Sequence, residues 1–190
     1  MRKICFALAA LLVSSTAQAD GELDKILSQF DKDRLANFDK TRSEALSEGL
    51  RGAPADVEIL TGALDGKPMP MDSGFDMTGT WKCRVIKVGG LLPLTPYGWF
   101  KCRVTDDGSG WSLEKISGSQ RLTGRFFTES ETRLVFVGAG HVNNDPARKY
   151  GSDPKEDQVA VVTRLGNNKI VLEFPAPQYE SKLDILLMER

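Results

Sequence analysis

Two copies of the tetrapeptide Lys-Cys-Arg-Val, at residues 82–85 and 101–104, contain the cysteines Cys83 and Cys102. Side chains alternate along a strand. An antiparallel pair with Cys83 opposite Cys102 would therefore place the apolar side chains on one face and the four cations on the other. The facing cations would repel one another, which is tolerable only where that face is in water. The same register brings the two thiols together.

The paired thiols could form a disulfide, bind a metal or act as a redox couple. A zinc site is poorly supported, because two cysteines and one distant histidine, His141, leave the ligand set incomplete. A redox couple usually has Cys-x-x-Cys spacing, which does not occur here. For an exported chain we predict a structural disulfide between Cys83 and Cys102. By the chain-entropy argument it would stabilise the fold by roughly 3 kcal/mol.

Arg121 and Arg125 belong to the segment SGSQRLTGRFF and alternate onto one face of an expected strand. Two guanidinium groups on one strand face could bind a carboxylate or a phosphate bidentately. If that face is the interior of the fold, it is a ligand site, with Gln120 and His141 as further candidate ligand-binding residues. If the face is outward, the arginines would instead pair with acids such as Glu180.

The sequence shows no pattern typical of a catalytic centre. The nucleophile elbow, the phosphate-binding loop, the dinucleotide-binding glycine motif and the zinc-protease motif are all missing. A Ser-His-acid triad would depend on His141, the single histidine. The acids Asp153, Glu156 and Asp157 lack the spacing of a calcium loop. We therefore predict no catalytic residue, no bound metal and no cofactor, and consider an enzyme the less favoured reading.

Residues 1–19 have the three parts of a secretory signal peptide. Arg2 and Lys3 form the basic region, and an apolar run follows at 4–13. That run is too short to span a bilayer, which takes about 20 residues. The small residues around Ala19 form a cleavage site, so we expect cleavage after Ala19 and a periplasmic or secreted location.

Residues 20–190 are enough for one domain with its own apolar core. The formal net charge of the whole chain is −1, and loss of the two signal-peptide cations leaves −3. This overall charge is neither that of a nucleic-acid footprint nor that of a polybasic membrane anchor, so we expect no nucleic-acid partner. No later segment is long and apolar enough for a transmembrane helix.

The elements that would position these residues change in kind along the chain. Residues 20–64 have helical spacing of apolar residues, with Asp31 as a helix N-cap, Gly49 near a helix end and Pro54 in the first turn of a third helix. Residues 65–78 form a linker rich in proline, glycine and methionine. In residues 79–190, short runs of alternating side chains between turn signals predict a β domain of short strands.

We expect eight strands in this β domain, with a tight hairpin turn at 166–168. Their approximate bounds are 80–87, 98–105, 111–116, 120–128, 133–139, 158–165, 169–174 and 182–188. Sequential strands with short connections favour an antiparallel up-and-down barrel, which leaves no exposed edge. A β-sandwich is the alternative. One long connection, 140–157, is either functional or irregular.

The apolar, glycine-rich segment between the two tetrapeptides ends beside Tyr97 and Trp99. An exposed apolar loop there would be a lid over a barrel mouth or a contact surface, and Tyr97 and Trp99 are further candidate ligand-binding residues. The alternative, that this loop folds into the core, is equally compatible with the sequence.

Several long motifs resemble an uncharacterised family of exported bacterial proteins, identified as domain of unknown function 4893. These motifs are YGWFKCRV, SGSQRLTGRFF, VFVGAGHV and PAPQYESKLDILLMER. The resemblance implies an envelope protein and supplies no catalytic residues. The Gly-Thr-Trp at 79–81 is similar, more loosely, to the G-x-W motif of lipocalins. A fold alone would not settle the function.

Together these patterns predict a periplasmic, lipocalin-like, non-catalytic module that binds a small acidic or amphipathic molecule. Arg121 and Arg125 would hold its polar end, with Tyr97 and Trp99 near the mouth. The alternative is an envelope interaction factor or enzyme inhibitor that contacts its partner through the helices and the loop 89–96. An open interior cavity facing the arginines would favour the first, and a filled barrel with an exposed apolar rim the second.

Overall fold

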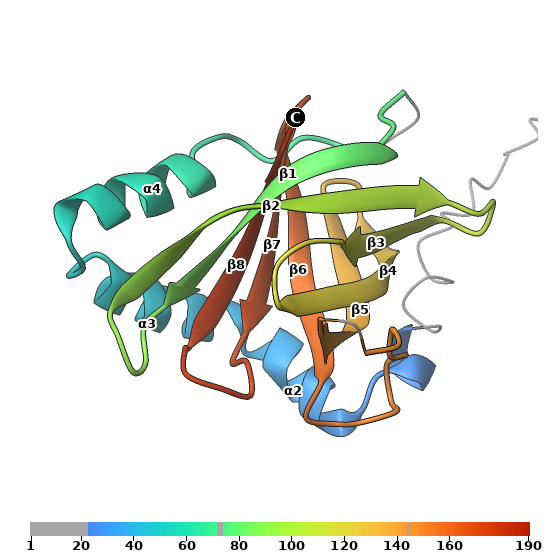
Figure 1. Ribbon diagram of the computed structural model, residues 1–190, viewed down its shortest axis with the longest axis horizontal. Coiled ribbons are helices and arrows are strands. Elements are labelled where there is room, and N and C mark those ends of the chain that lie inside the picture. Colours follow the sequence, from blue (N-terminus) through green and yellow to red (C-terminus); the bar gives the residue numbers. More distant parts are fainter. Residues whose placement is uncertain (1–22, 72–73, 144) are drawn as a thin grey trace, which may run out of the picture.

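Eight antiparallel strands form a closed barrel in the computed structural model, which describes residues 23–71, 74–143 and 145–190 (Figure 1). Each strand pairs with the next in sequence, and the last pairs with the first. The strands are β1 Gly79–Val88, β2 Leu94–Asp106, β3 Trp111–Lys115, β4 Gln120–Ser130, β5 Arg133–Val142, β6 Asp157–Gly166, β7 Lys169–Pro175 and β8 Leu183–Glu189. The predicted up-and-down barrel is confirmed, and the alternative sandwich is excluded. The predicted signal peptide lies outside the described residues.

The observed strands follow the predicted ones closely, with β2 as the main departure. It begins at Leu94 rather than near residue 98, although Pro96 lies within it. Leu94 pairs with Val88 and is buried, so packing extends the strand past the proline. Gly166 pairs with Lys169, which confirms the tight turn between β6 and β7.

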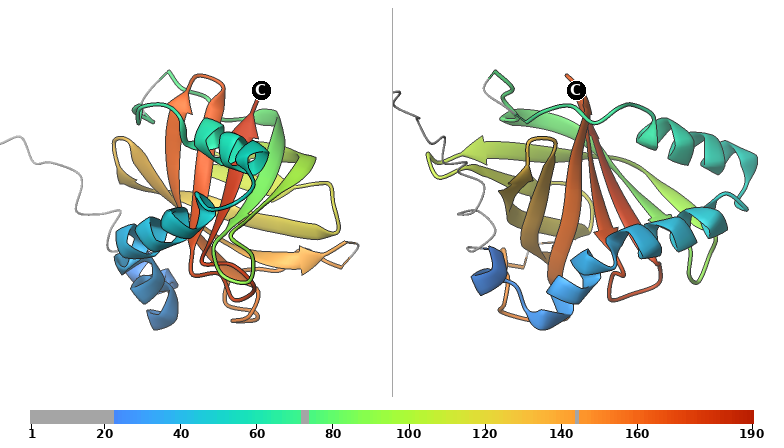
Figure 2. Two further views of the ribbon diagram at one scale, coloured as in Figure 1. Left: turned by 90° about the vertical axis from the view of Figure 1, so that its left-hand side faces the viewer. Right: turned by 180° about the vertical axis from the view of Figure 1, so that it is seen from behind.

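Within the described residues, the helices α2 Gln29–Ala36, α3 Phe38–Gly49 and α4 Pro54–Leu64 precede the barrel. They lie against the outside of the barrel rather than across an end (Figure 2). Pro54 occupies the first turn of α4, as predicted. The predicted N-cap Asp31 is wrong: the Ser28 hydroxyl caps α2 by accepting from the Asp31 backbone N–H, and Asp31 is buried within the helix.

Apolar side chains fill the barrel interior. They include Trp81, Cys83, Cys102, Val104, Leu113, Phe126, Leu134, Phe136, Ala160, Val162, Ile170, Leu172, Phe174, Leu186 and Met188. The Trp81 indole is fully buried, and its N–H donates to the Met77 carbonyl at 2.9 Å. Met77 belongs to segment 65–78, so this segment contributes directly to the core.

A second apolar layer lies between the helices and the outer barrel surface. Leu60 and Ala45 of the helices pack with Ile86, Ile185 and other residues on β1, β7 and β8. The segment around Leu23 and Leu27 covers the outer side of β5 and β6 in the same way. The outer faces of β3, the first part of β4, the later part of β2 and the first part of β1 carry no helix (Figure 1), whereas Leu94 at the start of β2 packs with Leu60 of α4.

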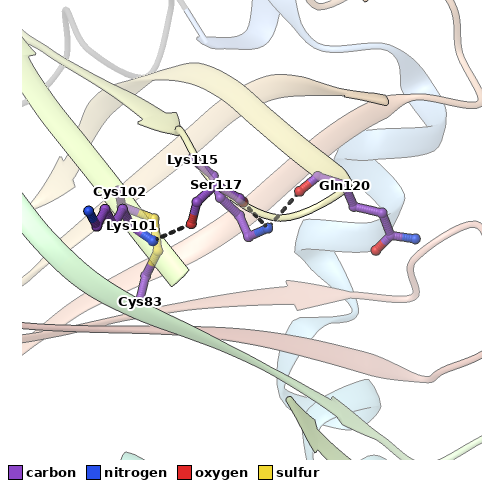
Figure 3. The surroundings of a disulfide bond; sticks show 6 residues. All are labelled: Cys83, Lys101, Cys102, Lys115, Ser117 and Gln120. Atoms are coloured by element: carbon purple, nitrogen blue, oxygen red, sulfur yellow. Dashed lines mark hydrogen bonds between the residues drawn. A yellow bond between two sulfur atoms is a disulfide. The ribbon is translucent and has the colours of Figure 1, made fainter. Parts of the chain in front are cut away.

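The predicted pairing of Cys83 opposite Cys102 is wrong by two residues. Cys83 faces Phe100, and Trp81 faces Cys102. A shift of two residues keeps every side chain on its face, so alternation alone could not distinguish the two registers. The disulfide still forms, between diagonal neighbours whose Cα atoms are 5.9 Å apart (Figure 3).

Candidate functional site

A pocket of about 610 Å³ opens at one end of the barrel. It lies where β2 and β4 end and where β3 and β5 begin, beside segment 65–78. Its lining residues are Pro70, Met71, Asp106, Gly110, Trp111, Phe126, Thr128, Ser130, Glu131 and Leu134. We call it the mouth pocket.

Pro70 and Met71 of segment 65–78 form one side of the mouth pocket, and specific contacts hold this part of the segment there. The Met71 backbone N–H donates to the Glu131 carbonyl at 2.7 Å. Arg164 donates through Nη1 to the Pro70 carbonyl at 2.8 Å, and its guanidinium carbon lies 3.9 Å from the centre of the Phe75 ring. The described parts of the predicted linker therefore pack against the barrel end.

The mouth pocket combines an apolar floor with a polar rim. Phe126 and Leu134 are buried at the floor, and Trp111 packs against the same core. The rim contains the exposed carboxylates Asp106 and Glu131, together with two hydroxyl side chains. Such a lining can hold an apolar group below and a hydroxyl or ammonium group above.

Arg121 and Arg125 lie on the outer face of β4, away from the interior. The neighbouring positions Leu122 and Phe126 pack into the core, and alternation turns the arginines outward. Arg125 donates to both Asp107 carboxylate oxygens, at 2.8 and 3.0 Å. This pair lowers the pKa of the Asp107 carboxyl well below its usual range.

His141 and Gln120 also lie away from the mouth pocket. His141 faces Arg121 across β4 and β5 on the outer surface and is half-buried. Gln120 accepts a hydrogen bond through its backbone carbonyl from Lys115 Nζ at 2.6 Å (Figure 3). Burial, with a smaller contribution from Arg121, lowers the pKa of Lys115 to about 8.

Tyr97 and Trp99 are exposed by 42% and 41% respectively, and neither lines the mouth pocket. Trp99 lies on the outer side of β2, under the side chains of Lys82 and Arg84. The six residues predicted to bind a ligand are therefore not gathered at one cavity. Their role in binding stays a prediction.

The apolar loop between β1 and β2 is exposed rather than folded into the core. Leu91 and Leu92 expose 79% and 59% of their surface. By the criterion derived from the sequence, a filled interior with an exposed apolar rim favours a contact surface over an interior ligand site formed by the arginines.

A protein-family model described as "Domain of unknown function (DUF4893)" matches residues 24–188. The chain belongs to this family. No curated protein and no solved structure matches it. Within the described residues, no helix has the length and apolar character needed to cross a membrane. In the same ranges, no three histidine, cysteine or acidic side chains gather as metal ligands would.

A second, smaller pocket of this family member, about 290 Å³, lies between the start of α3 and the outer side of β6 and β7. At its wall Arg42 donates through Nε to the Glu173 carboxylate at 2.6 Å. Glu173 is only 6% exposed. Burial raises the pKa of this carboxyl, and Arg42 offsets the rise only in part.

The mouth-pocket residues were missed because they are scattered in sequence. Met71 precedes the strands, Trp111 begins β3, and Phe126 and Leu134 lie on either side of a hairpin. One usable signal was present: the methionines and prolines of segment 65–78 are apolar enough to pack against a barrel end. Nothing in the sequence indicated which end that would be.

Proposed function

We propose that this protein is a non-catalytic binding protein that holds a small amphipathic molecule in the mouth pocket. The supporting observation is the pocket itself: a volume of about 610 Å³ with an apolar floor and a polar rim. Small-molecule sites in proteins usually have this range of volume and this mixture of lining groups.

The charge of the rim suggests which polar group the ligand carries. Asp106 and Glu131 are the charged residues of the lining. A carboxylate accepts hydrogen bonds from hydroxyl or ammonium groups and repels an anion. We therefore propose a neutral or cationic head group in place of the acidic one expected from the arginines, while the amphipathic character of the ligand is kept.

Export forms part of the proposal. Residues 1–19 have the pattern of a cleavable signal peptide. The disulfide between Cys83 and Cys102 suits the oxidising conditions of the periplasm or the extracellular space. A ligand-binding protein of this kind would meet its ligand in the cell envelope.

Three probes with one alkyl chain and different head groups test the proposal: octylamine, octanol and octanoate. Binding would be followed by native mass spectrometry and by the fluorescence of Trp111, with Trp111→Phe to assign the signal. We expect octylamine and octanol to bind and octanoate to bind at least tenfold more weakly, because two carboxylates face the head group.

A matched pair of variants locates the binding site. Glu131→Gln should weaken octylamine by about tenfold and leave octanol nearly unchanged, because a hydrogen bond to a charged group contributes about 1.5–3 kcal/mol. Glu114→Gln changes an exposed carboxylate on the outer face of β3 and should change neither affinity. If no probe binds, or if octanoate binds as tightly as octylamine, the proposal is wrong.

A further inference from the structure

Four cations and one tryptophan gather on the part of the outer barrel surface that carries no helix. They are Lys82 and Arg84 of β1, Lys101 and Arg103 of β2, and Trp99 of β2. We call this set the cationic wall. Lys82 and Lys101 are direct cross-strand partners, and so are Arg84 and Trp99. Side chains this close on one face form a single patch.

The charge of the wall is mostly uncompensated. Lys82 pairs with Glu189 at 3.0 Å. Lys101 and Arg103 are exposed and form no ion pair with any residue that the structure describes. Glu114 faces Arg103 across β2 and β3, yet no salt bridge joins them. The whole chain has a formal net charge of −1, so this patch differs in sign from the molecule around it.

Such a patch has a cost in the isolated protein. Like charges directly opposite each other destabilise a strand pair, and Lys82 faces Lys101 in this way. A partner that brings negative charge to the wall would remove the repulsion. Charge complementarity therefore indicates an anionic partner.

Trp99 helps to decide which anionic partner fits. The Lys82 amine lies 4.5 Å from the centre of its ring, and the Arg84 guanidinium carbon lies 4.4 Å from it. A sugar ring or a nucleic-acid base that stacked on Trp99 would have to displace these cations. A lipid head-group layer needs no stacking. It takes cations on its phosphates and accepts an amphipathic indole at its boundary.

We propose that the cationic wall docks on a membrane surface that contains anionic phospholipids. The protein would rest on the head groups through Lys101 and Arg103, with Trp99 at the interface, and would not cross the bilayer. The inference is independent of the mouth pocket, since none of the five wall residues lines it.

The test is co-sedimentation of the chain starting at Asp20, which keeps every described residue, with two kinds of vesicle. One contains phosphatidylcholine alone, and the other contains phosphatidylcholine with phosphatidylglycerol. We expect binding only to the second kind, falling steeply as salt is added. The double variant Lys101→Glu/Arg103→Glu should weaken it by more than about tenfold, because it removes two cations from the contact and places two carboxylates against anionic head groups.

The matched control is the double variant Lys149→Glu/Lys155→Glu. It makes the same change in net charge on exposed lysines of the β5–β6 connection. This control should keep at least half of the binding. Circular dichroism and thermal unfolding would verify that both variants fold.

Three results would overturn the proposal: no binding of the original chain to phosphatidylglycerol vesicles, equal loss in both double variants, or binding to heparin or single-stranded DNA without binding to vesicles. The last would assign the wall to a soluble polyanion instead.

Discussion

Cys83 and Cys102 are bonded although they are diagonal rather than directly opposite in the β1–β2 ladder. Their Cα atoms are 5.9 Å apart, within the range that a disulfide spans. Both sulfur atoms are buried among the interior side chains. The bond therefore ties together two strands at the centre of the core, and it links residues that are 19 positions apart in the chain.

The variant Cys83→Ala/Cys102→Ala should lose about 3 kcal/mol of unfolding free energy, because the bond restricts the unfolded chain. Urea unfolding followed by circular dichroism measures this. A reducing agent should lower the stability of the original chain and leave the variant unchanged. Two free thiols in the mass of the non-reduced, exported protein would contradict the disulfide.

Gly138→Ala should destabilise the barrel by about 1–3 kcal/mol through overpacking. A Cβ at Gly138 would lie 2.6 Å from Phe136 Cζ and nearer still to the Thr123 carbonyl oxygen, which belongs to the backbone and cannot turn away. Thermal unfolding measures the loss. Gly62→Ala is the control, because nothing lies within 4 Å of its added Cβ. As a change in a helix interior it should leave stability unchanged or raise it by up to about 1 kcal/mol.

The pH dependence of stability should change in Glu173→Gln. Burial raises the pKa of the Glu173 carboxyl above its ordinary value of 4.5, so the folded state holds this proton more tightly than the unfolded state. Its contribution is complete below pH 4.5 and is lost as the pH rises through the folded-state pKa. As the pH rises from acid to neutral, the glutamine variant should therefore become more stable relative to the original chain.

Melting temperatures of the two proteins from acid to neutral pH measure this difference. Glu58→Gln, which changes an exposed carboxylate on α4, should follow the original chain. A difference of the opposite sign for Glu173→Gln would mean that the ion pair with Arg42 outweighs burial.

The side-chain amine of Lys115 should titrate near pH 8, well below an ordinary lysine, because burial disfavours its charged form. Carbon-13 NMR of the labelled lysine Cε measures the pKa directly. Arg121→Gln removes the second cause of the shift and should raise this pKa. Arg148→Gln, a change in the β5–β6 connection, should leave it where it is. An ordinary lysine pKa in the original chain would show that Lys115 is more hydrated than its 5% exposure indicates.

The elements of the fold were predictable because their signals are local. Turn residues separate runs of alternating side chains, and each run appears as a strand within a few residues of its expected bounds. Pro54 marked the start of α4 for the same reason, since its fixed φ suits a first helical turn. The residue that caps α2 was harder to predict. Ser28 and Asp31 are both good caps, and only the ion pair between Asp31 and Arg34, inside the helix, shows that Ser28 is the cap.

The candidate site was much less predictable. Alternation placed Arg121 and Arg125 on one face, but it could not say which face of β4 would look inward. The apolar positions Leu122 and Phe126 are on the other face, and their burial turned the arginines outward. Net charge was similarly uninformative, because it averages over the chain and conceals the local excess of cations around Lys101.

The sequence alone determined the succession of strands and turns along the chain and the alternation of side chains along each strand, because these depend on neighbours in sequence. It predicted the disulfide but not the register that forms it. The tertiary structure decided the exact register of Cys83, the outward direction of Arg125 and the assembly of the mouth pocket around Trp111. Each of these depends on contacts between segments that are distant in sequence, and these contacts form only when the barrel closes.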